Sequence, residues 1–138
     1  MITNGDGLPD DDGYLFNPDH LYDNDETLRR FAVISVSKRR LTVYEPVLLR
    51  MLSSDPSEDM RRHVIRALGN IRSRASILPI LHILSTEKGL IAGDAAEALG
   101  KLKAEEARDE LIRQSTSEIQ WVAQKCRWAL KQLSTGSG

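Results

Sequence analysis

Apolar and polar positions along the chain repeat one pattern at intervals of roughly 31 residues. The apolar positions recur as Met60, Val64, Ala67 and Leu68, then Ile91, Ala95, Ala98 and Leu99, then Val122, Cys126, Ala129 and Leu130. Spacings of three and four residues place such side chains on one face of an α-helix. A fixed period of this length is typical of proteins that stack copies of one helical unit. The pattern therefore predicts a repeat protein built from amphipathic helices.

The same periodicity predicts four long helices and three shorter ones. The long helices are expected at 24–37, 56–68, 88–99 and 116–133, and the shorter ones at 44–53, 76–86 and 105–114. A short and a long helix form a hairpin whose apolar stripes are covered only by neighbouring hairpins. We therefore expect an all-α fold, a short right-handed α-solenoid of about four helical hairpins.

Helix starts and ends carry their own sequence signals. Capping boxes, in which an acceptor side chain precedes a Glu by three residues, occur as Asp23 with Glu26, Thr42 with Glu45, Asp55 with Glu58, and Ser115 with Glu118. Gly69 and Gly100 follow predicted helices, where a left-handed residue commonly ends a helix. Gly93 lies inside a predicted helix, where glycine costs about 1 kcal/mol relative to alanine. It either admits the backbone of a partner or marks a weak helix.

Residues 1–22 lack helical periodicity. They are dense in Asp and turn-forming residues, which predicts an acidic, largely disordered and mobile tail. A calcium loop around Asp10 and Asp12 is the alternative, but it places Leu8 where an oxygen ligand is needed.

Both ends of the chain differ from the repeats between them. The apolar residues at 14–16 and 21–22 are expected to dock on the open end of the repeats. Residues 134–138 have the composition of a flexible linker or expression scar. The repeat domain is therefore expected at 23–133.

Composition agrees with a helical core, because 41% of the residues are apolar and only 5% aromatic. The single cysteine, Cys126, excludes a disulfide within one chain, and its place in the apolar pattern predicts a buried thiol. No segment has the length and apolar character of a membrane span or a secretory signal, so we expect a cytoplasmic protein without a membrane partner.

Charge is strongly segregated although the net charge is only -1. Residues 1–28 carry eight acidic and no basic side chains, whereas residues 29–74 carry eleven basic and four acidic ones. Such an asymmetry bears on association with charged partners rather than on the fold.

The repeated motifs resemble those of a known family. Ala-Leu-Gly occurs at 67–69 and 98–100, and an Asp precedes an Arg by six residues at Asp23 and Arg29 and again at Asp55 and Arg61. Over residues 23–133 the chain resembles HEAT repeats, specifically the short HEAT-like repeats named after the phycobilisome lyases.

This resemblance implies that the Asp and Arg residues form a ladder that ties neighbouring repeats together. Arg29 and Arg61 are then structural rather than binding residues. The later repeats depart from the pattern, since Thr86 and Ala92, then Ser117 and Ala123, occupy the places of Asp55 and Arg61. We expect the ladder to be broken there.

No residue pattern supports catalysis. The three histidines, His20, His63 and His82, lack the spacing that places two metal ligands on one helical face. The iron-dependent hydroxylases that share this resemblance carry His-Glu pairs, and the sequence has none. There is also no P-loop, dinucleotide-binding glycine pattern or nucleophile elbow. We therefore expect a protein that is not an enzyme and has no metal, cofactor or catalytic residues.

Partner binding has better candidates on the long helices. The predicted partner-binding residues lie beside the apolar stripes and are Arg30, Arg62, Arg66, Trp121 and Trp128. Resemblance to HEAT repeats implies that they line a concave face, and Arg and Trp are enriched at binding hot spots. For Trp121 and Trp128 the alternative is that they close the last repeat.

These features predict a non-enzymatic adaptor or scaffold that binds another protein with an acidic surface. The acidic tail would then compete with that partner for the basic face. One alternative is nucleic-acid binding, which the pI near 6.3 and the acidic tail disfavour. Another, which rests on the resemblance alone, is a non-catalytic subunit of a bilin lyase or phycobilisome-handling factor. Self-association through the last helix is a further alternative.

Overall fold

The structure, a computed structural model, describes residues 8–135. Within this range the chain forms seven α-helices, four short 3-10 helices and no strands. The predicted all-α fold of repeated helical hairpins is confirmed. The chain divides into two compact units, Met1–Ile71 and Arg72–Gly138. They are called unit 1 and unit 2 below.

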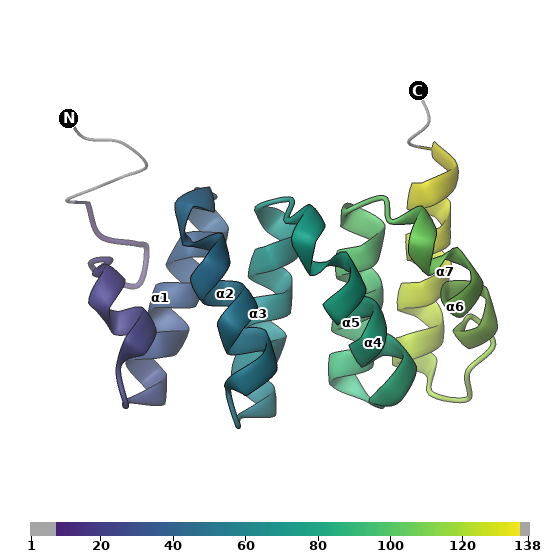
Figure 1. Cartoon of the computed structure of the whole chain (residues 1–138), viewed down its shortest axis with the longest axis horizontal. Coiled ribbons are helices and arrows are strands. Elements are labelled where there is room, and N and C mark those ends of the chain that lie inside the picture. The colour runs from purple at the N-terminus through teal and green to yellow at the C-terminus, as the bar shows by residue number, and fades with distance from the viewer. Residues whose placement is uncertain (1–7, 136–138) are drawn as a thin grey trace. The chain divides into compact units, whose positions relative to one another are not determined.

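Unit 1 contains the helices α1, α2 and α3. Its elements are η1 (Pro18–Tyr22), α1 (Glu26–Arg39), η2 (Thr42–Tyr44), α2 (Glu45–Ser54) and α3 (Glu58–Asn70). The long helices α1 and α3 run side by side with α2 in front of them in Figure 1, and η1 packs against α1. Their apolar stripes meet in a core that includes Val33, Leu48 and Leu68, none of which is exposed.

Unit 2 contains two complete helical hairpins. Its elements are η3 (Arg74–Ser76), α4 (Ile77–Thr86), α5 (Leu90–Lys101), η4 (Glu105–Ala107), α6 (Arg108–Gln114) and α7 (Gln120–Thr135). Figure 1 shows α5 and α7 side by side; α4 packs on α5 and α6 packs on α7. The buried residues Ile80, Leu99 and Leu111 belong to this core.

Three long helices begin later than the capping boxes predict. Asp25 caps α1 by accepting from the Thr27 amide at 2.8 Å, while Asp23 accepts from the Asp25 amide. In α3 the Ser57 hydroxyl accepts from the Met60 amide at 3.1 Å, and Asp55 accepts from the Ser57 amide.

The predicted caps Asp23 and Asp55 therefore form a turn that orients the true cap two residues later. Just before α7 the accepting residue is again later than predicted. Ser117, and not the predicted cap Ser115, accepts a hydrogen bond from the Ile119 amide at 3.1 Å. The capping box predicted at Thr42 is wrong, because Thr42 lies in η2 and α2 begins without a side-chain cap.

The left-handed residues at the helix ends are not the glycines that the sequence predicted. Gly69 and Gly100 lie inside α3 and α5, so their predicted role is wrong. The left-handed residues after α1, α3 and α5 are Arg40, Arg72 and Lys103, with φ of 52°, 61° and 51°.

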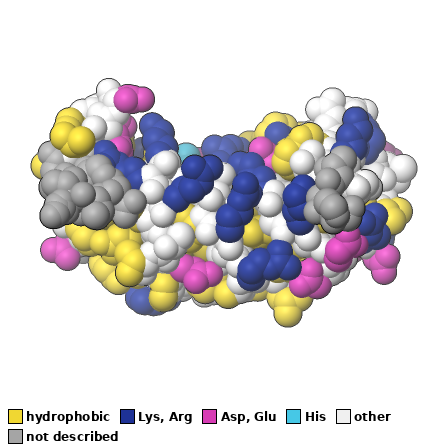
Figure 2. Space-filling view, turned by 90° about the horizontal axis from the view of Figure 1, so that it is seen from above, with side chains coloured by type: hydrophobic (Ala, Val, Ile, Leu, Met, Phe, Trp, Pro, Cys, Tyr) yellow, Lys and Arg dark blue, Asp and Glu magenta, His cyan; other side chains and the backbone are white. Residues whose placement is uncertain are grey.

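Each of these three basic residues donates to a carbonyl near the end of the next long helix. Arg40 reaches Asn70 O at 3.3 Å, Arg72 reaches Lys101 O at 3.0 Å and Lys103 reaches Gln132 O at 3.0 Å. The last carbonyls of a helix lack intrahelical partners and carry negative partial charge, so cationic donors stabilise them. Figure 2, a space-filling view from above, shows Lys and Arg side chains on the face that is seen.

The N-terminal segment of unit 1 packs against α1. Tyr14 stacks on Phe31 of α1 with ring centroids 5.3 Å apart, and Leu21 is only 2% exposed. Asp10 accepts two bonds from Arg39, at 2.9 and 2.6 Å. The predicted docking is seen for Tyr14, Phe16 and Leu21, whereas Leu15 and Tyr22 remain 54% and 60% exposed. Residues 8–22 therefore pack in part against the helices, unlike the predicted mobile tail. The rest of that predicted tail, 1–7, lies outside the described residues.

Candidate functional site

The predicted basic residues lie on two adjacent helices of unit 1. Arg30 is on α1, between Glu26 and Asp59, with a 3.8 Å separation from a carboxylate oxygen of each. Arg62 is half-buried on α3, and Arg66 on the same helix is exposed. All three arginines lie close enough to His63 of α3 to lower its pKa, so they belong to one surface of unit 1.

A shallow groove of ≈ 260 Å³ lies between these helices. It is lined from α1 by Ile34, Ser37 and Lys38 and from α3 by His63, Arg66 and Asn70. The Asn70 amide donates to the Ser37 hydroxyl at 2.7 Å, which links the two walls. Of the predicted residues, only Arg66 lines this groove.

Lys38 and His63 are the ionisable groove residues that the sequence did not identify as binding residues. Burial lowers the pKa of His63 below its ordinary value of 6.5; Asp59 opposes this, while Arg66, Arg30 and Arg62 lower the pKa further. A lowered pKa keeps the imidazole neutral at neutral pH. The signal in the sequence was the position of His63 between two arginines on one helix.

The two tryptophans pack against glycines within unit 2. A Cβ on Gly93 would lie 1.9 Å from Trp121 Nε1, and one on Gly100 would lie 2.8 Å from a ring carbon of Trp128. The Trp121 indole also donates to Leu90 O at 3.1 Å and is covered by Lys125, whose Nζ is 4.6 Å from the ring centroid.

Gly93 therefore makes room for Trp121 and does not mark a weak helix. Both tryptophans pack α7 against α5, and Trp128 remains 38% exposed. The tryptophans belong to unit 2, whereas the predicted arginines belong to unit 1.

The predicted Asp–Arg ladder is present in unit 1. Arg29 on α1 donates through Nε to Asp55 Oδ2 at 3.2 Å and through Nη1 to Asp23 O at 2.9 Å. The Asp55 side chain is only 6% exposed. Through these two contacts Arg29 links the segment before α1 to the segment before α3, as the resemblance implied.

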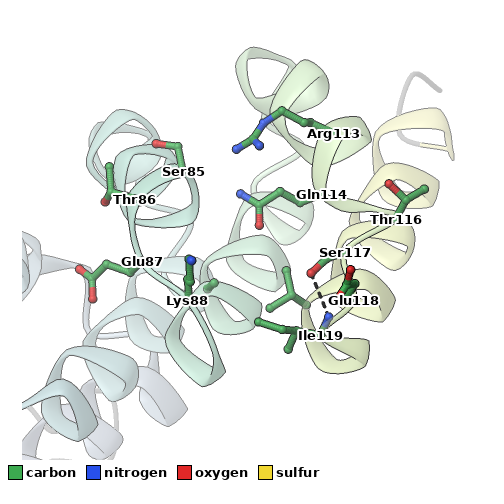
Figure 3. A pocket seen from close by; sticks show the side chains of 12 residues that line it. Ser85, Thr86, Glu87, Lys88, Arg113, Gln114, Thr116, Ser117, Glu118 and Ile119 are labelled. Carbon is green, nitrogen blue, oxygen red and sulfur yellow. Dashed lines mark hydrogen bonds between the residues drawn. The ribbon is translucent and has the colours of Figure 1, made fainter.

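Unit 2 has a pocket of ≈ 470 Å³ between the end of α4 and the start of α7. Its lining includes Thr86, Ala92 and Ser117, the residues that replace the ladder positions. Figure 3 shows Arg113 and Gln114 of α6 extending toward Ser85 and Lys88, while Glu87 turns away from them. Sequence reasoning predicted the broken ladder but not the pocket.

Little in the described part of the chain points to metal or thiol chemistry. Residues 8–135 contain no group of three or more His, Cys, Asp or Glu side chains placed to hold a metal ion. Cys126 is buried, and its burial raises the pKa of the thiol to about 11, so the reactive thiolate is scarce at neutral pH. None of the helices over this range is both long and apolar enough to cross a membrane.

Comparisons with known proteins place these features in context. The family model for HEAT repeats matches residues 45–131. A deoxyhypusine hydroxylase from Gallus gallus is 32% identical over 82 residues. That match covers 58% of this chain and 27% of the hydroxylase, so the chain spans about a quarter of that relative's length.

Proposed function

This chain belongs to the HEAT-repeat family, and from that premise we propose that it is a non-enzymatic adaptor that binds an acidic protein through unit 1. Stacked helical repeats commonly serve as interaction scaffolds, because they present extended surfaces of regularly spaced side chains. The finer similarity to phycobilisome-lyase repeats stays a prediction, as does a cytoplasmic location.

The basic groove between α1 and α3 is the observation that carries this proposal. Lys38, His63 and Arg66 line it, with Arg30 and Arg62 on the same two helices. Acidic side chains of a partner would meet a positive potential there, which accelerates association and selects against basic partners.

Similarity to the hydroxylase does not imply that this chain is an enzyme. The matched region is only 27% of that protein. This chain has no His-Glu pair anywhere in its sequence, so it lacks the residue pair that the resemblance associates with iron-dependent hydroxylases. Binding without catalysis is therefore the function that its residues support.

The test is a pull-down from nuclease-treated lysate of the source, with the bound proteins identified by mass spectrometry. Wild type is compared with Arg62→Glu/Arg66→Glu and with a control of equal charge change outside the groove, Arg50→Glu/Lys131→Glu. Far-UV circular dichroism establishes that each variant is folded. The expected result is a protein captured by wild type and by the control but not by the groove variant.

Direct binding of the captured protein then measures the size of the effect. Reversal of the charge of Arg66 in the groove and of Arg62 on the same helix should weaken binding by about tenfold or more, and each tenfold change in affinity corresponds to about 1.4 kcal/mol. A bound acidic partner should also raise the pKa of His63, because negative charge favours the protonated imidazole. Loss of all binding after nuclease treatment would instead indicate nucleic-acid binding and would refute the adaptor.

A further inference from the structure

Unit 2 leaves open a space that unit 1 fills with an arginine. In unit 1 the Arg29 guanidinium contacts Asp55 of the following repeat and the Asp23 carbonyl of its own repeat. The corresponding residues of unit 2 are Ala92, Ser117 and Thr86, and all of them line the ≈ 470 Å³ pocket. Loss of the long arginine side chain and of its acidic partner therefore accounts for the cavity.

Two cationic side chains, Lys88 and Arg113, line this pocket. Lys88 has no hydrogen bond or ion pair with any described residue. Among the described residues, Glu110 accepts from Nε and Nη2 of Arg113, which positions the guanidinium. Nη1 of Arg113 is then available to a ligand.

Two hydroxyl groups add neutral donors to this pair of cations. Ser117 Oγ accepts from the Ile119 amide at 3.1 Å, so its own hydrogen remains available to a ligand. Thr116 also lines the pocket and is exposed.

We propose that this pocket binds a carboxylate or phosphate group carried by an extended segment of a partner protein. The anion pairs with Lys88 and Arg113 and accepts hydrogen bonds from the hydroxyl groups beside them. Charge-assisted bonds of this kind are about twice as strong as neutral ones, and a partly enclosed pocket screens them less than an open surface. Two carboxylates also line the pocket, Glu87 and Glu118. Glu87 turns away in Figure 3 and has a partner of its own.

A cationic ligand fits the pocket less well. It would meet Lys88 and Arg113, and the acidic residue that holds the arginine in unit 1 is replaced by Ser117. The site lies in unit 2, so it does not depend on the groove proposed for unit 1. It gives the adaptor a second contact for an acidic segment.

The test is a nuclear magnetic resonance titration of the ¹⁵N-labelled full chain at low ionic strength. The probes are a hexaglutamate peptide, a phosphoserine peptide of the same length and inorganic phosphate, with hexalysine as the control. We expect the amide signals of Ser85, Lys88, Arg113 and Ser117 to shift with at least one anionic probe. A response to hexaglutamate alone assigns the site to carboxylates, and a response to the phosphate probes alone assigns it to phosphorylated segments.

Variants separate this pocket from general charge attraction. Lys88→Glu should abolish the shifts, whereas Lys131→Glu, an equal charge change elsewhere in unit 2, should retain them. Ala92→Arg should also abolish them by filling the cavity as Arg29 does in unit 1. The proposal is overturned if no anionic probe shifts these signals, if hexalysine shifts them equally, or if the shifts survive Lys88→Glu. Signals of His63 and Arg66 report on the unit 1 groove in the same spectra, so the two proposals fail independently.

Discussion

Two glycines of α5 leave room for the two tryptophans of α7. Gly93 faces Trp121 and Gly100 faces Trp128, and each pair is separated by the same distance along the chain. The backbone of α7 also approaches closely, since a Cβ on Gly100 would lie 2.8 Å from the Cα of Ala129. These contacts specify how α7 packs on α5, because a side chain at either glycine would collide with the facing helix.

Gly93→Ala is predicted to destabilise the protein, although alanine is the better helix former. Helix propensity favours alanine by about 1 kcal/mol. The new Cβ, however, would displace an indole that Leu90 O and Lys125 hold in place, and overpacking of this kind costs about 1–3 kcal/mol. We expect a net loss of about 1 kcal/mol in the free energy of unfolding, measured with urea.

Trp121→Ala supplies the matched background for this measurement. Without the indole, Gly93→Ala should stabilise the protein by about 1 kcal/mol, as expected from helix propensity alone. A stabilising Gly93→Ala in the wild-type background would show that Trp121 does not constrain this position.

Helix ends in this protein combine a strained backbone with a charge contact. Arg40, Arg72 and Lys103 take the left-handed conformation, which glycine usually adopts at such ends. Their side chains donate to the ends of neighbouring long helices. A glycine relieves the backbone strain but loses this contact between repeats, so the basic residue links one hairpin to the next.

Lys103 allows the backbone and side-chain contributions to be separated. Lys103→Ala and Lys103→Gly both remove the bond to Gln132 O, but only alanine keeps the strain of a positive φ. After allowance for the greater freedom of glycine in the unfolded chain, Lys103→Gly should be more stable than Lys103→Ala by about 0.5–1 kcal/mol. Equal thermal midpoints for the two variants would contradict a strained backbone at this position.

Over the whole molecule, the acidic N-terminal segment is attached to the basic part of unit 1. Asp10 pairs with Arg39, Leu21 is buried, and Tyr14 stacks on Phe31. The segment therefore covers part of α1. The ion pair of Asp10 involves Arg39 and not a residue that lines the groove.

Deletion of residues 1–22 is predicted to destabilise the protein. Removal of a buried leucine side chain alone costs about 2–5 kcal/mol, and a loss of 2 kcal/mol lowers the thermal midpoint by roughly 5–15 °C in a chain of this size. Thermal unfolding followed by circular dichroism measures the change, with the exposed Asp11→Asn as the control. An unchanged midpoint in the deletion variant would mean that the segment is a mobile tail after all.

Much of the fold follows from the sequence, because helix periodicity depends on side chains close together in the chain. Most helix ends lie within about two residues of their predicted positions. The start of α3 shows why the small errors arose. Asp55 and Ser57 are both good capping residues, and Asp55 is drawn into the contact with Arg29, which leaves Ser57 as the cap.

The candidate sites were less predictable than the fold. The sequence identified Arg66 but not Lys38, which reaches the same groove from another helix. The sequence indicated Trp121 and Trp128 as binding residues because of their residue type, yet the glycines of α5 that face them determine how they pack. Residues far apart in the chain become neighbours only through packing, so their joint chemistry is not visible in a linear pattern.

The sequence by itself determined the repeat, the helical hairpins, the charge segregation and the positions where the Asp–Arg ladder fails. Each of these depends on residue identity and spacing along one chain segment. Only the tertiary structure decided that Arg29 fills a space in unit 1 that stays open beside Ala92 in unit 2, and that Lys88 and Arg113 face it. A cavity exists only when separate helices have been placed, because its walls come from several of them and its volume is set by how closely they pack.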